Sequence, residues 1–189
     1  MITNCDLLMV ADSNNDAALS EMADRARILM EEPRFITATV FRLAGDKWQP
    51  HEFAKPHPLS VAFANIQKLE LARNYADQRE GLQIEVGDEL RVTAQKAGTQ
   101  PDDDTMYLYA SWIKTVPQAL PKSDFIMLFD LDEPNMVTKV PWQALVDVAG
   151  LLLQPMGTFP ARYRVEQFPN AQQLAELQRR ADVVVVQLK

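Results

Sequence analysis

Apolar residues follow two different spacings in alternating segments of this chain, and that pattern constrains the fold more than any other feature. In one kind of segment they recur every three or four residues, as between Leu19 and Leu29, which places them on one face of an α-helix. In the other kind they form short, nearly continuous runs, as in Phe125 to Leu131, which is typical of a buried strand. The chain is therefore expected to be an α+β protein, with an antiparallel or mixed sheet and helices packed on it.

The N-terminal part, residues 1–97, predicts an alternation of single strands, helices and hairpins. Side chains that can accept a backbone N–H precede the first helix, and prolines or glycines separate the elements. The expected elements are a strand over 6–11, a helix that begins after 13–16 and ends at Pro33, a hairpin over 35–53, a helix from Ser60 and a hairpin over 82–94. The first six of these elements follow the β-α-β-β-α-β order of a ferredoxin-like arrangement, although other α+β sandwiches share the same order.

The C-terminal part begins after the most polar stretch of the chain, the loop 98–105. Pro141 suits the first turn of a helix, and Asn170 with Gln173 resembles a capping box at the start of another. The expected elements are strands over 106–113 and 125–131 with an irregular piece between them, a helix from Pro141, an edge strand over 161–167, a helix after Asn170 and a central strand over 183–186. The prediction is one globular domain over 1–189, with possible halves 1–97 and 106–189 joined by the loop 98–105.

The charge of the chain excludes some partners and favours another. Among the 189 residues 26 are acidic and 19 are basic, so the formal net charge is −7 at pH 7. Proteins that bind nucleic acids or anionic membranes usually carry basic patches, and no run of Lys or Arg occurs here. Neither partner is expected. An acidic surface suits a basic protein partner, although the same charge also serves solubility alone.

The cysteine count and the apolar stretches predict a cytoplasmic protein. Cys5 is the only cysteine, so an internal disulfide cannot form. The N-terminus lacks the charged and apolar regions of a signal peptide. The longest mostly apolar stretch, 144–153, is interrupted by Asp147 and is far shorter than the ~20 residues of a membrane span.

The most suggestive catalytic pattern is an apolar strand that ends in Asp130-x-Asp132. Residues 125–134 resemble the first motif of haloacid-dehalogenase-type phosphatases, and the resemblance implies a carboxylate nucleophile and a magnesium site. The chain departs from that family at Glu133-Pro134, where a small Gly-Thr pair is expected, and little sequence follows for the other catalytic groups. Glycosyltransferases also use Asp-x-Asp, but no nucleotide site accompanies it. The pattern favours a strand that leaves the core into an acidic turn.

Other catalytic and cofactor patterns are missing from the sequence. His51 and His57 are the only histidines, and their proline-rich loop lacks the helix that would fix two zinc ligands on one face. The six glycines are scattered, so no phosphate-binding loop can be drawn for ATP or NAD. The three consecutive aspartates lack the alternating ligand pattern of a calcium loop. No catalytic residue, metal ligand or cofactor is therefore predicted.

What remains is a non-enzymatic, acidic protein-binding module, such as an immunity, antitoxin or inhibitor-type protein acting on a basic partner. Exposed acidic loops steer association, and tyrosines are enriched in binding hot spots. The predicted partner-binding residues are Asp102, Asp103, Asp104, Asp130, Asp132, Glu133, Tyr107 and Tyr109. Two alternatives stay open: a small enzyme or a small-molecule or metal binder that uses carboxylates near Asp130 and Asp132, and a structural assembly subunit.

Overall fold

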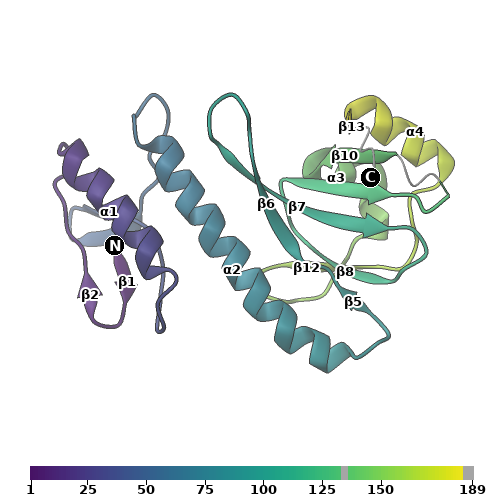
Figure 1. Ribbon diagram of the computed structural model, residues 1–189, viewed down its shortest axis with the longest axis horizontal. Helices are drawn as coiled ribbons and strands as arrows, with labels where there is room; N and C mark the ends of the chain where they lie inside the picture. The colour runs from purple at the N-terminus through teal and green to yellow at the C-terminus, as the bar shows by residue number, and fades with distance from the viewer. Residues whose placement is uncertain (133–135, 185–189) are drawn as a thin grey trace. The chain divides into compact units, whose positions relative to one another are not determined.

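The computed structural model describes residues 1–132 and 136–184, and within them the chain combines helices with several sheets (Figure 1). This confirms the expected α+β class. The elements are β1 (Ile2–Asn4), β2 (Leu7–Leu8), α1 (Asp16–Leu29), β3 (Phe41–Ala44), β4 (Lys47–Pro50), α2 (Ser60–Val86), β5 (Arg91–Val92), β6 (Gln95–Thr99), β7 (Met106–Ile113), β8 (Gln118–Pro121), β9 (Phe125–Phe129), β10 (Val137–Pro141), α3 (Trp142–Ala149), the 3-10 turn η1 (Gly150–Leu152), β11 (Gln154–Pro155), β12 (Arg162–Val165), α4 (Ala171–Arg180) and β13 (Asp182–Val184).

The chain divides into two compact units. Unit 1 comprises residues 1–71 and 99–106, and unit 2 comprises 72–98 and the chain from Tyr107 onward. Helix α2 contributes its first part to unit 1 and its second part to unit 2. The expected single domain, with its possible halves 1–97 and 106–189, stays a prediction, because compactness does not show which part folds alone.

In unit 1, helix α1 begins where the sequence predicts. The Asn15 side chain accepts the backbone N–H of Ala18 at 3.0 Å, which satisfies one of the amides that a helix start leaves without a partner. The helix ends at Leu29, ahead of Pro33. Its apolar face packs with the start of α2 in a core made of Met1, Leu19, Met22, Ala23, Ala26, Met30, Ala38, Val40, Phe63 and Ile66.

The strands of unit 1 are shorter than predicted. The strand expected over 6–11 is reduced to β2, which pairs with β1, a strand that the sequence did not predict. The strand expected from Phe35 begins only at Phe41. The segment before it makes a single bridge to β1, between Phe35 and Asn4, and is otherwise held in part by side chains. The N–H of Ala38, for instance, donates to the Glu70 carboxylate of α2 at 2.9 Å.

The hairpin predicted over 82–94 is wrong, because its first half is the end of helix α2. Leu82 and Val86 lie four residues apart and pack on the same small core as Leu90, while Ile84 between them is 85% exposed. The alternation seen in the sequence is therefore also compatible with a helix, whose faces repeat at three and four residues. Gly87, with φ +60°, ends the helix in the left-handed conformation that glycine favours.

The ferredoxin-like arrangement of the N-terminal part is not confirmed. That fold needs one four-stranded sheet, whereas β1 pairs with β2 and β3 pairs with β4 in separate two-stranded sheets. The next two strands, β5 and β6, belong to two further sheets in unit 2. The order of elements was therefore not sufficient to predict the sheet topology, because it does not specify which strands pair.

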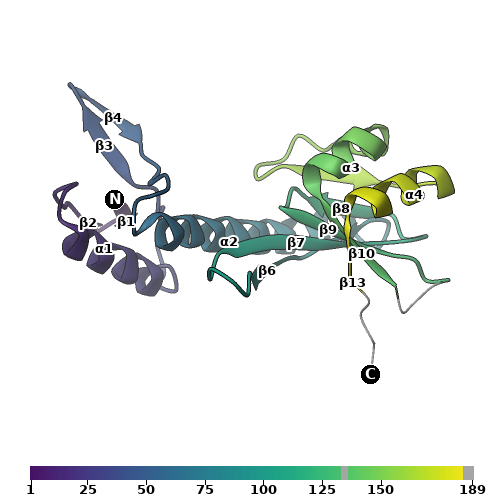
Figure 2. The same cartoon turned by 90° about the horizontal axis from the view of Figure 1, so that it is seen from above.

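Unit 2 contains a five-stranded sheet of order β13-β10-β9-β7-β6. Strands β7 and β9 are parallel, and β10 is antiparallel to both β9 and β13. Helices α3 and α4 lie on the same side of this sheet (Figure 2). The enclosed core is formed by Ala110, Trp112, Leu120, Ile126, Leu128, Val140, Leu145, Ala149, Leu153, Val165 and Leu177. The strands predicted over 106–113 and 125–131 and the capping box of Asn170 and Gln173 are confirmed.

The second sheet of unit 2, of order β11-β12-β8-β5, corrects two predictions. The segment with Pro117 and Pro121 was expected to be irregular, but it forms the fully buried strand β8. The prolines lie just before the strand and at its last residue, where a missing N–H is tolerated. The strand expected at an edge, β12, lies between β11 and β8.

The valine-rich C-terminal strand was expected to lie centrally. Its described part, β13, is instead the end member of the five-stranded sheet, and residues 185 and 186 lie outside the described residues.

A buried arginine, Arg162 on β12, joins the elements of unit 2. It is 1% exposed, and its guanidinium donates to Gln78 Oε1 at 2.6 Å and to the carbonyl oxygens of Thr93, Ala119 and Tyr75 at 2.8, 3.1 and 3.1 Å. These acceptors come from α2, from the residue after β5, and from β8. Burial lowers the pKa of Arg162 to about 10, so the side chain is still charged at pH 7. Through these hydrogen bonds the planar guanidinium connects helix α2 with β8, β12 and the end of β5.

Candidate functional site

The predicted acidic loop lies in unit 1 and has a fixed backbone. The buried side chain of Asn65 donates to the Asp104 carbonyl oxygen at 2.9 Å and accepts the N–H of Met106 at 2.8 Å. A bond from Gln100 N–H to the Thr105 carbonyl oxygen, at 2.8 Å, closes the loop between β6 and β7. Asp104 has φ +54°, a conformation that aspartate tolerates better than most residues.

The three carboxylates of this loop, Asp102, Asp103 and Asp104, are exposed. Asp103 accepts the N–H of Thr105 at 3.1 Å and lies 3.8 Å from the ammonium of Lys55, a mostly exposed and therefore weak ion pair. The hydroxyl and the N–H of Thr105 that face the carboxylate lower the pKa of Asp103, although only the N–H makes a full hydrogen bond. The loop thus presents ionised side chains on an ordered backbone.

The Asp130–Asp132 turn lies in unit 2 and is paired with a lysine. Strands β7 and β9 are parallel, so the residues that follow them, Lys114 and Asp130, meet at the same edge of the sheet. Lys114 Nζ lies 2.9 and 3.0 Å from the two oxygens of Asp130 and 2.5 Å from Asp132 Oδ2. Glu133, the third acidic residue predicted here, lies outside the described residues.

The pairing with Lys114 changes the titration of this turn. Hydrogen bonds to Asp132 and Asp130 raise the pKa of Lys114. Burial acts to raise the pKa of Asp130, but the bonds from Lys114 and from the Asp132 amide outweigh it and lower that pKa. The two carboxylates therefore share one ammonium, which stands where a divalent cation would have to bind.

The two predicted tyrosines lie on the face of the five-stranded sheet opposite to α3 and α4. Tyr107 and Tyr109 are half-buried, whereas Leu108 and Trp112 on the other face are buried in the core. Tyr107 packs directly on Gly98 of β6, where an added Cβ would come within 2.5 Å of the ring.

A lysine fixes the same tyrosine from a second side. Lys139 Nζ lies 4.3 Å from the centre of the Tyr107 ring and 4.1 Å from that of Phe125, within the range of a cation–π interaction. The two rings contact each other edge to face, with centres 5.5 Å apart. Tyr107 is therefore an ordered aromatic side chain, held between Gly98 and Lys139.

The predicted partner-binding residues are divided between the two units. Asp102, Asp103 and Asp104 belong to unit 1, and the others belong to unit 2. Within unit 2, Tyr109 is opposite Phe125 at the start of β9, whereas Asp130 follows the end of that strand. The length of β9, at roughly 3.3 Å per residue, separates the tyrosines from the acidic turn.

The structure also reveals an exposed element that the sequence reasoning did not single out. The sequence predicts a hairpin around Gly45, and the structure confirms it as the separate sheet β3–β4. Leu43 and Trp48 face each other across this hairpin and are 52% and 63% exposed. The alternation of apolar and polar residues along both strands was visible in the sequence. Only the structure shows that no other element of unit 1 covers the apolar side.

The two histidines lie in no cluster of metal-binding side chains among the described residues. His57 accepts the N–H of Leu59 at 3.1 Å and lies 3.6 Å from Asp16, and both histidines contact the ring of Phe53. Over 1–132 and 136–184, no three His, Cys, Asp or Glu side chains gather closely enough to hold a metal ion. In the same residues no helix combines the length and the apolar character needed to cross a membrane.

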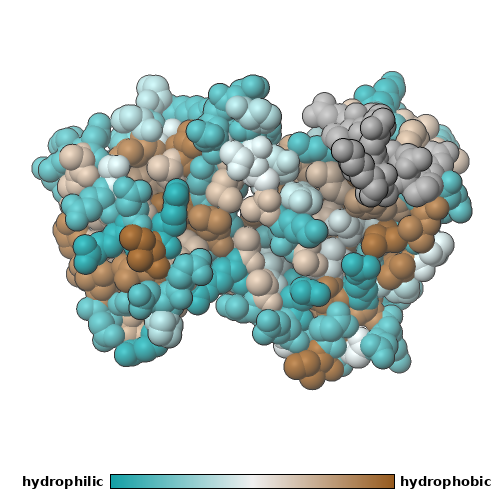
Figure 3. Space-filling view, viewed as in Figure 1, coloured by the Kyte–Doolittle hydropathy of each residue, from teal (hydrophilic) through white to brown (hydrophobic). Residues whose placement is uncertain are grey.

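The visible surface gives no single dominant patch. Figure 3 shows one face of the molecule, on which hydrophilic side chains predominate and hydrophobic ones form small, separate areas. Comparison of the chain with protein-family models, with curated proteins and with solved structures finds no match. Any function must therefore be argued from the residues themselves.

Proposed function

We propose that this chain is a non-enzymatic protein-binding module of the immunity, antitoxin or inhibitor type, and that its partner is a basic protein. The observation that supports this proposal best is the acidic loop of unit 1. Three exposed carboxylates follow one another at Asp102, Asp103 and Asp104, and Asn65 holds the backbone on which they stand.

The negative charge and the ordered backbone of the loop both favour binding. Carboxylates at an exposed tip attract a basic surface over about one Debye length, ~8 Å at physiological ionic strength, and so raise the association rate. The two hydrogen bonds of Asn65 mean that the backbone is already ordered before the partner arrives. Less conformational entropy is then lost on binding than with a flexible acidic loop.

The acidic turn of unit 2 is a weaker contact for a basic partner. Lys114 already neutralises one of the two charges of Asp130 and Asp132, so an incoming lysine or arginine would have to compete with it. The same ammonium counts against the alternative of a carboxylate metal site at this turn. The charged loop is therefore the element to test first.

The test compares three proteins with the same backbone. In the loop variant, D102N/D103N/D104N, asparagine keeps the shape of each side chain and tolerates the left-handed conformation of residue 104. The control variant, D24N/E31Q/E32Q, removes the same number of charges from exposed positions elsewhere in unit 1. Each protein is immobilised and exposed to extract of the source organism at 0.05 and 0.5 M salt, and retained proteins are identified by mass spectrometry.

The proposal expects a basic protein that is retained by the wild type and by the control variant at low salt and is released at 0.5 M salt. With the purified partner, the loop variant should associate about tenfold more slowly at low salt, a difference that vanishes at high salt. A fourth protein, N65A, keeps every charge but loosens the loop, and it should dissociate faster. Equal association rates for the loop and control variants, or retention only of acidic proteins, would contradict the proposal.

A further inference from the structure

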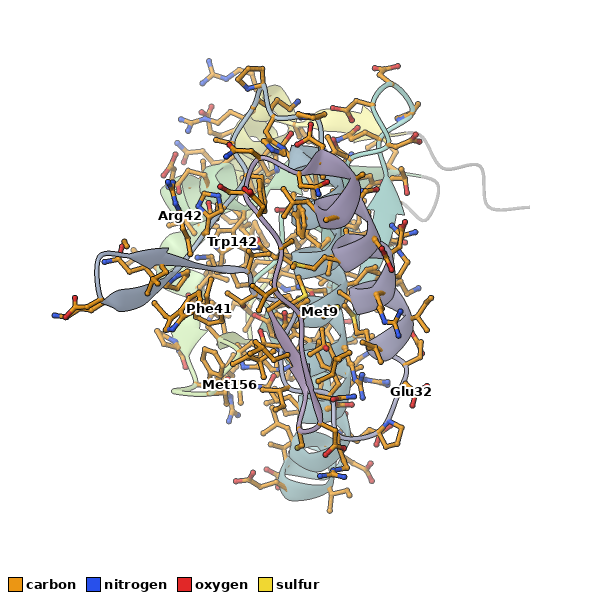
Figure 4. All side chains as sticks on the ribbon, turned by 90° about the vertical axis from the view of Figure 1, so that its left-hand side faces the viewer. Met9, Glu32, Phe41, Arg42, Trp142 and Met156 are labelled. Atoms are coloured by element: carbon orange, nitrogen blue, oxygen red, sulfur yellow. The ribbon has the colours of Figure 1, made fainter. Side chains whose placement is uncertain are left out.

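Helices α1 and α2 of unit 1 begin at the same end of that unit, the upper end in Figure 4. His57 lies between the two starts, with 27% of its side chain exposed. Its Nδ1 accepts the N–H of Leu59, directly ahead of α2, at 3.1 Å, and its Nε2 lies 3.6 Å from the carboxylate of Asp16 in the first turn of α1. One imidazole therefore connects the beginnings of two helices.

The start of α2 depends on His57 because of the residue that stands at the capping position. The carbonyl oxygen of Leu59 accepts the first helical hydrogen bond, from the N–H of Phe63, so a leucine stands where a serine, threonine or asparagine side chain usually caps a helix. His57 compensates for this leucine. Its side chain accepts the N–H of Leu59, and its carbonyl oxygen accepts the N–H of Ser60 at 3.1 Å. One histidine thus satisfies two consecutive amides at the beginning of the helix.

These contacts determine where the proton of the imidazole lies at neutral pH. A neutral imidazole has one nitrogen that donates and one that accepts. Since Nδ1 of His57 accepts from Leu59, the proton lies on Nε2, the atom that faces Asp16. Protonation adds a hydrogen to Nδ1, and that nitrogen then donates and no longer accepts. The bond from the Leu59 amide is therefore available only to the neutral side chain.

The two helices respond in opposite ways to a charge on His57. On the side of α1, the carboxylate of Asp16 attracts an imidazolium. On the side of α2, residues 60–63 form a first turn without a charged side chain, and the positive end of the helix dipole disfavours an added cation. A proton on His57 thus weakens its contact with α2 and strengthens its contact with α1.

Two further ionisable groups lie close to His57. Lys55, on the same segment, pairs with Asp103 of the loop between β6 and β7 at 3.8 Å. His51 contacts the ring of Phe53, as His57 does, and the centre of each imidazole lies 4.8 Å from the centre of that ring. His51 therefore reaches His57 only by way of Phe53, and its replacement serves as a control for the titration of His57.

We propose that His57 is a pH-sensitive switch in unit 1. The neutral imidazole holds the amide of Leu59 and faces Asp16 with its Nε2–H. As the pH falls through the range in which histidine side chains become charged, about pH 8 to 5, the imidazolium releases Leu59 and keeps its contact with Asp16. Mild acid thereby loosens the start of α2 while the segment before it stays attached to α1.

Amide hydrogen exchange of the full chain, labelled with 15N, measures this switch. The protection factor of Leu59, which is corrected for the intrinsic effect of pH on exchange, should fall about fivefold between pH 7.5 and 5.5, the change expected for the loss of a helix cap. H57N should be equally protected at both pH values, because asparagine accepts an amide two residues on and does not titrate. H51N, the control, should respond like the wild type. D16N lacks the counter-charge, so its protection should fall at a lower pH.

Nitrogen-15 spectra of the imidazoles give an independent readout that needs no change at His57. At pH 7.5 Nδ1 of His57 should be unprotonated in the wild type and in H51N. An Nδ1 that carries the proton at pH 7.5 overturns the proposal, as does equal protection of Leu59 at both pH values in the wild type. A loss in H57N as large as in the wild type, or a loss in D16N at an unchanged pH, also overturns it. No partner is present in these measurements, so their outcome is independent of the function proposed for the acidic loop.

Discussion

Replacing Arg162 with methionine tests whether the buried guanidinium holds unit 2 together. Methionine keeps the unbranched apolar part of the side chain but removes the guanidinium and its four hydrogen bonds, each worth about 1.5 kcal/mol because the donor is charged. Part of this loss is regained, since a desolvated cation disappears from the core. Burial lowers the pKa of Arg162 from its ordinary value to about 10, which corresponds to a penalty of about 3 kcal/mol. The expected net loss of unfolding free energy is therefore about 3 kcal/mol.

The matched control is R164M on the same strand. Arg164 is 46% exposed and pairs with Glu166 at 2.8 Å, so its loss should change stability by less than about 1 kcal/mol. Urea unfolding is followed by tryptophan fluorescence in a W48F background, which leaves only Trp112 and Trp142 of unit 2 as reporters. If R162M lost less than about 1 kcal/mol, or no more than R164M, the assigned role of the guanidinium would be refuted.

Two further substitutions probe the other ordered contacts of unit 2. G98A should destabilise unit 2 by about 1 kcal/mol, because the new methyl group displaces the Tyr107 ring. In a Y107S background this loss should be smaller. Equal losses in both backgrounds would contradict the packing of Tyr107 on Gly98. D130N should lower the melting temperature by about 2–4 °C at pH 7, as expected for about 1 kcal/mol in a chain of this size. Because the folded-state pKa of Asp130 is lowered, its contribution is present above the ordinary carboxyl pKa and is lost as the pH falls through the folded value. The two melting temperatures should therefore converge as the pH falls below the ordinary carboxyl pKa, and a constant difference would argue against the pairing with Lys114.

Local features of the fold could be predicted from the sequence where a few adjacent residues determine the structure. Asn15 and Asn170 cap helices because their side chains bond amides within three residues. The turn at Gly45 needs a positive φ, and it places the two strands of the hairpin in register without help from the rest of the chain. The acidic loop was also recognisable from its composition.

Pairing over longer distances could not be predicted in this way. The alternation of Leu82, Ile84 and Val86 fits a strand. The segment is helical because Leu82 and Val86 pack together on one core, which the sequence does not show. The strand β8 was missed because its prolines are acceptable only in view of where its neighbours begin and end.

For the candidate site, the sequence by itself determined the chemical groups, and the tertiary structure decided their partners. The sequence shows Asp130 and Asp132 as a pair of carboxylates, but Lys114 reaches them only because β7 and β9 are parallel neighbours. Likewise, the sequence around Leu43 and Trp48 predicts a hairpin with one buried side. Only the tertiary structure shows that this apolar side is left exposed. The physical reason is the same in both cases: local bonds depend on adjacent residues, whereas burial and charge pairing depend on which distant segments come together.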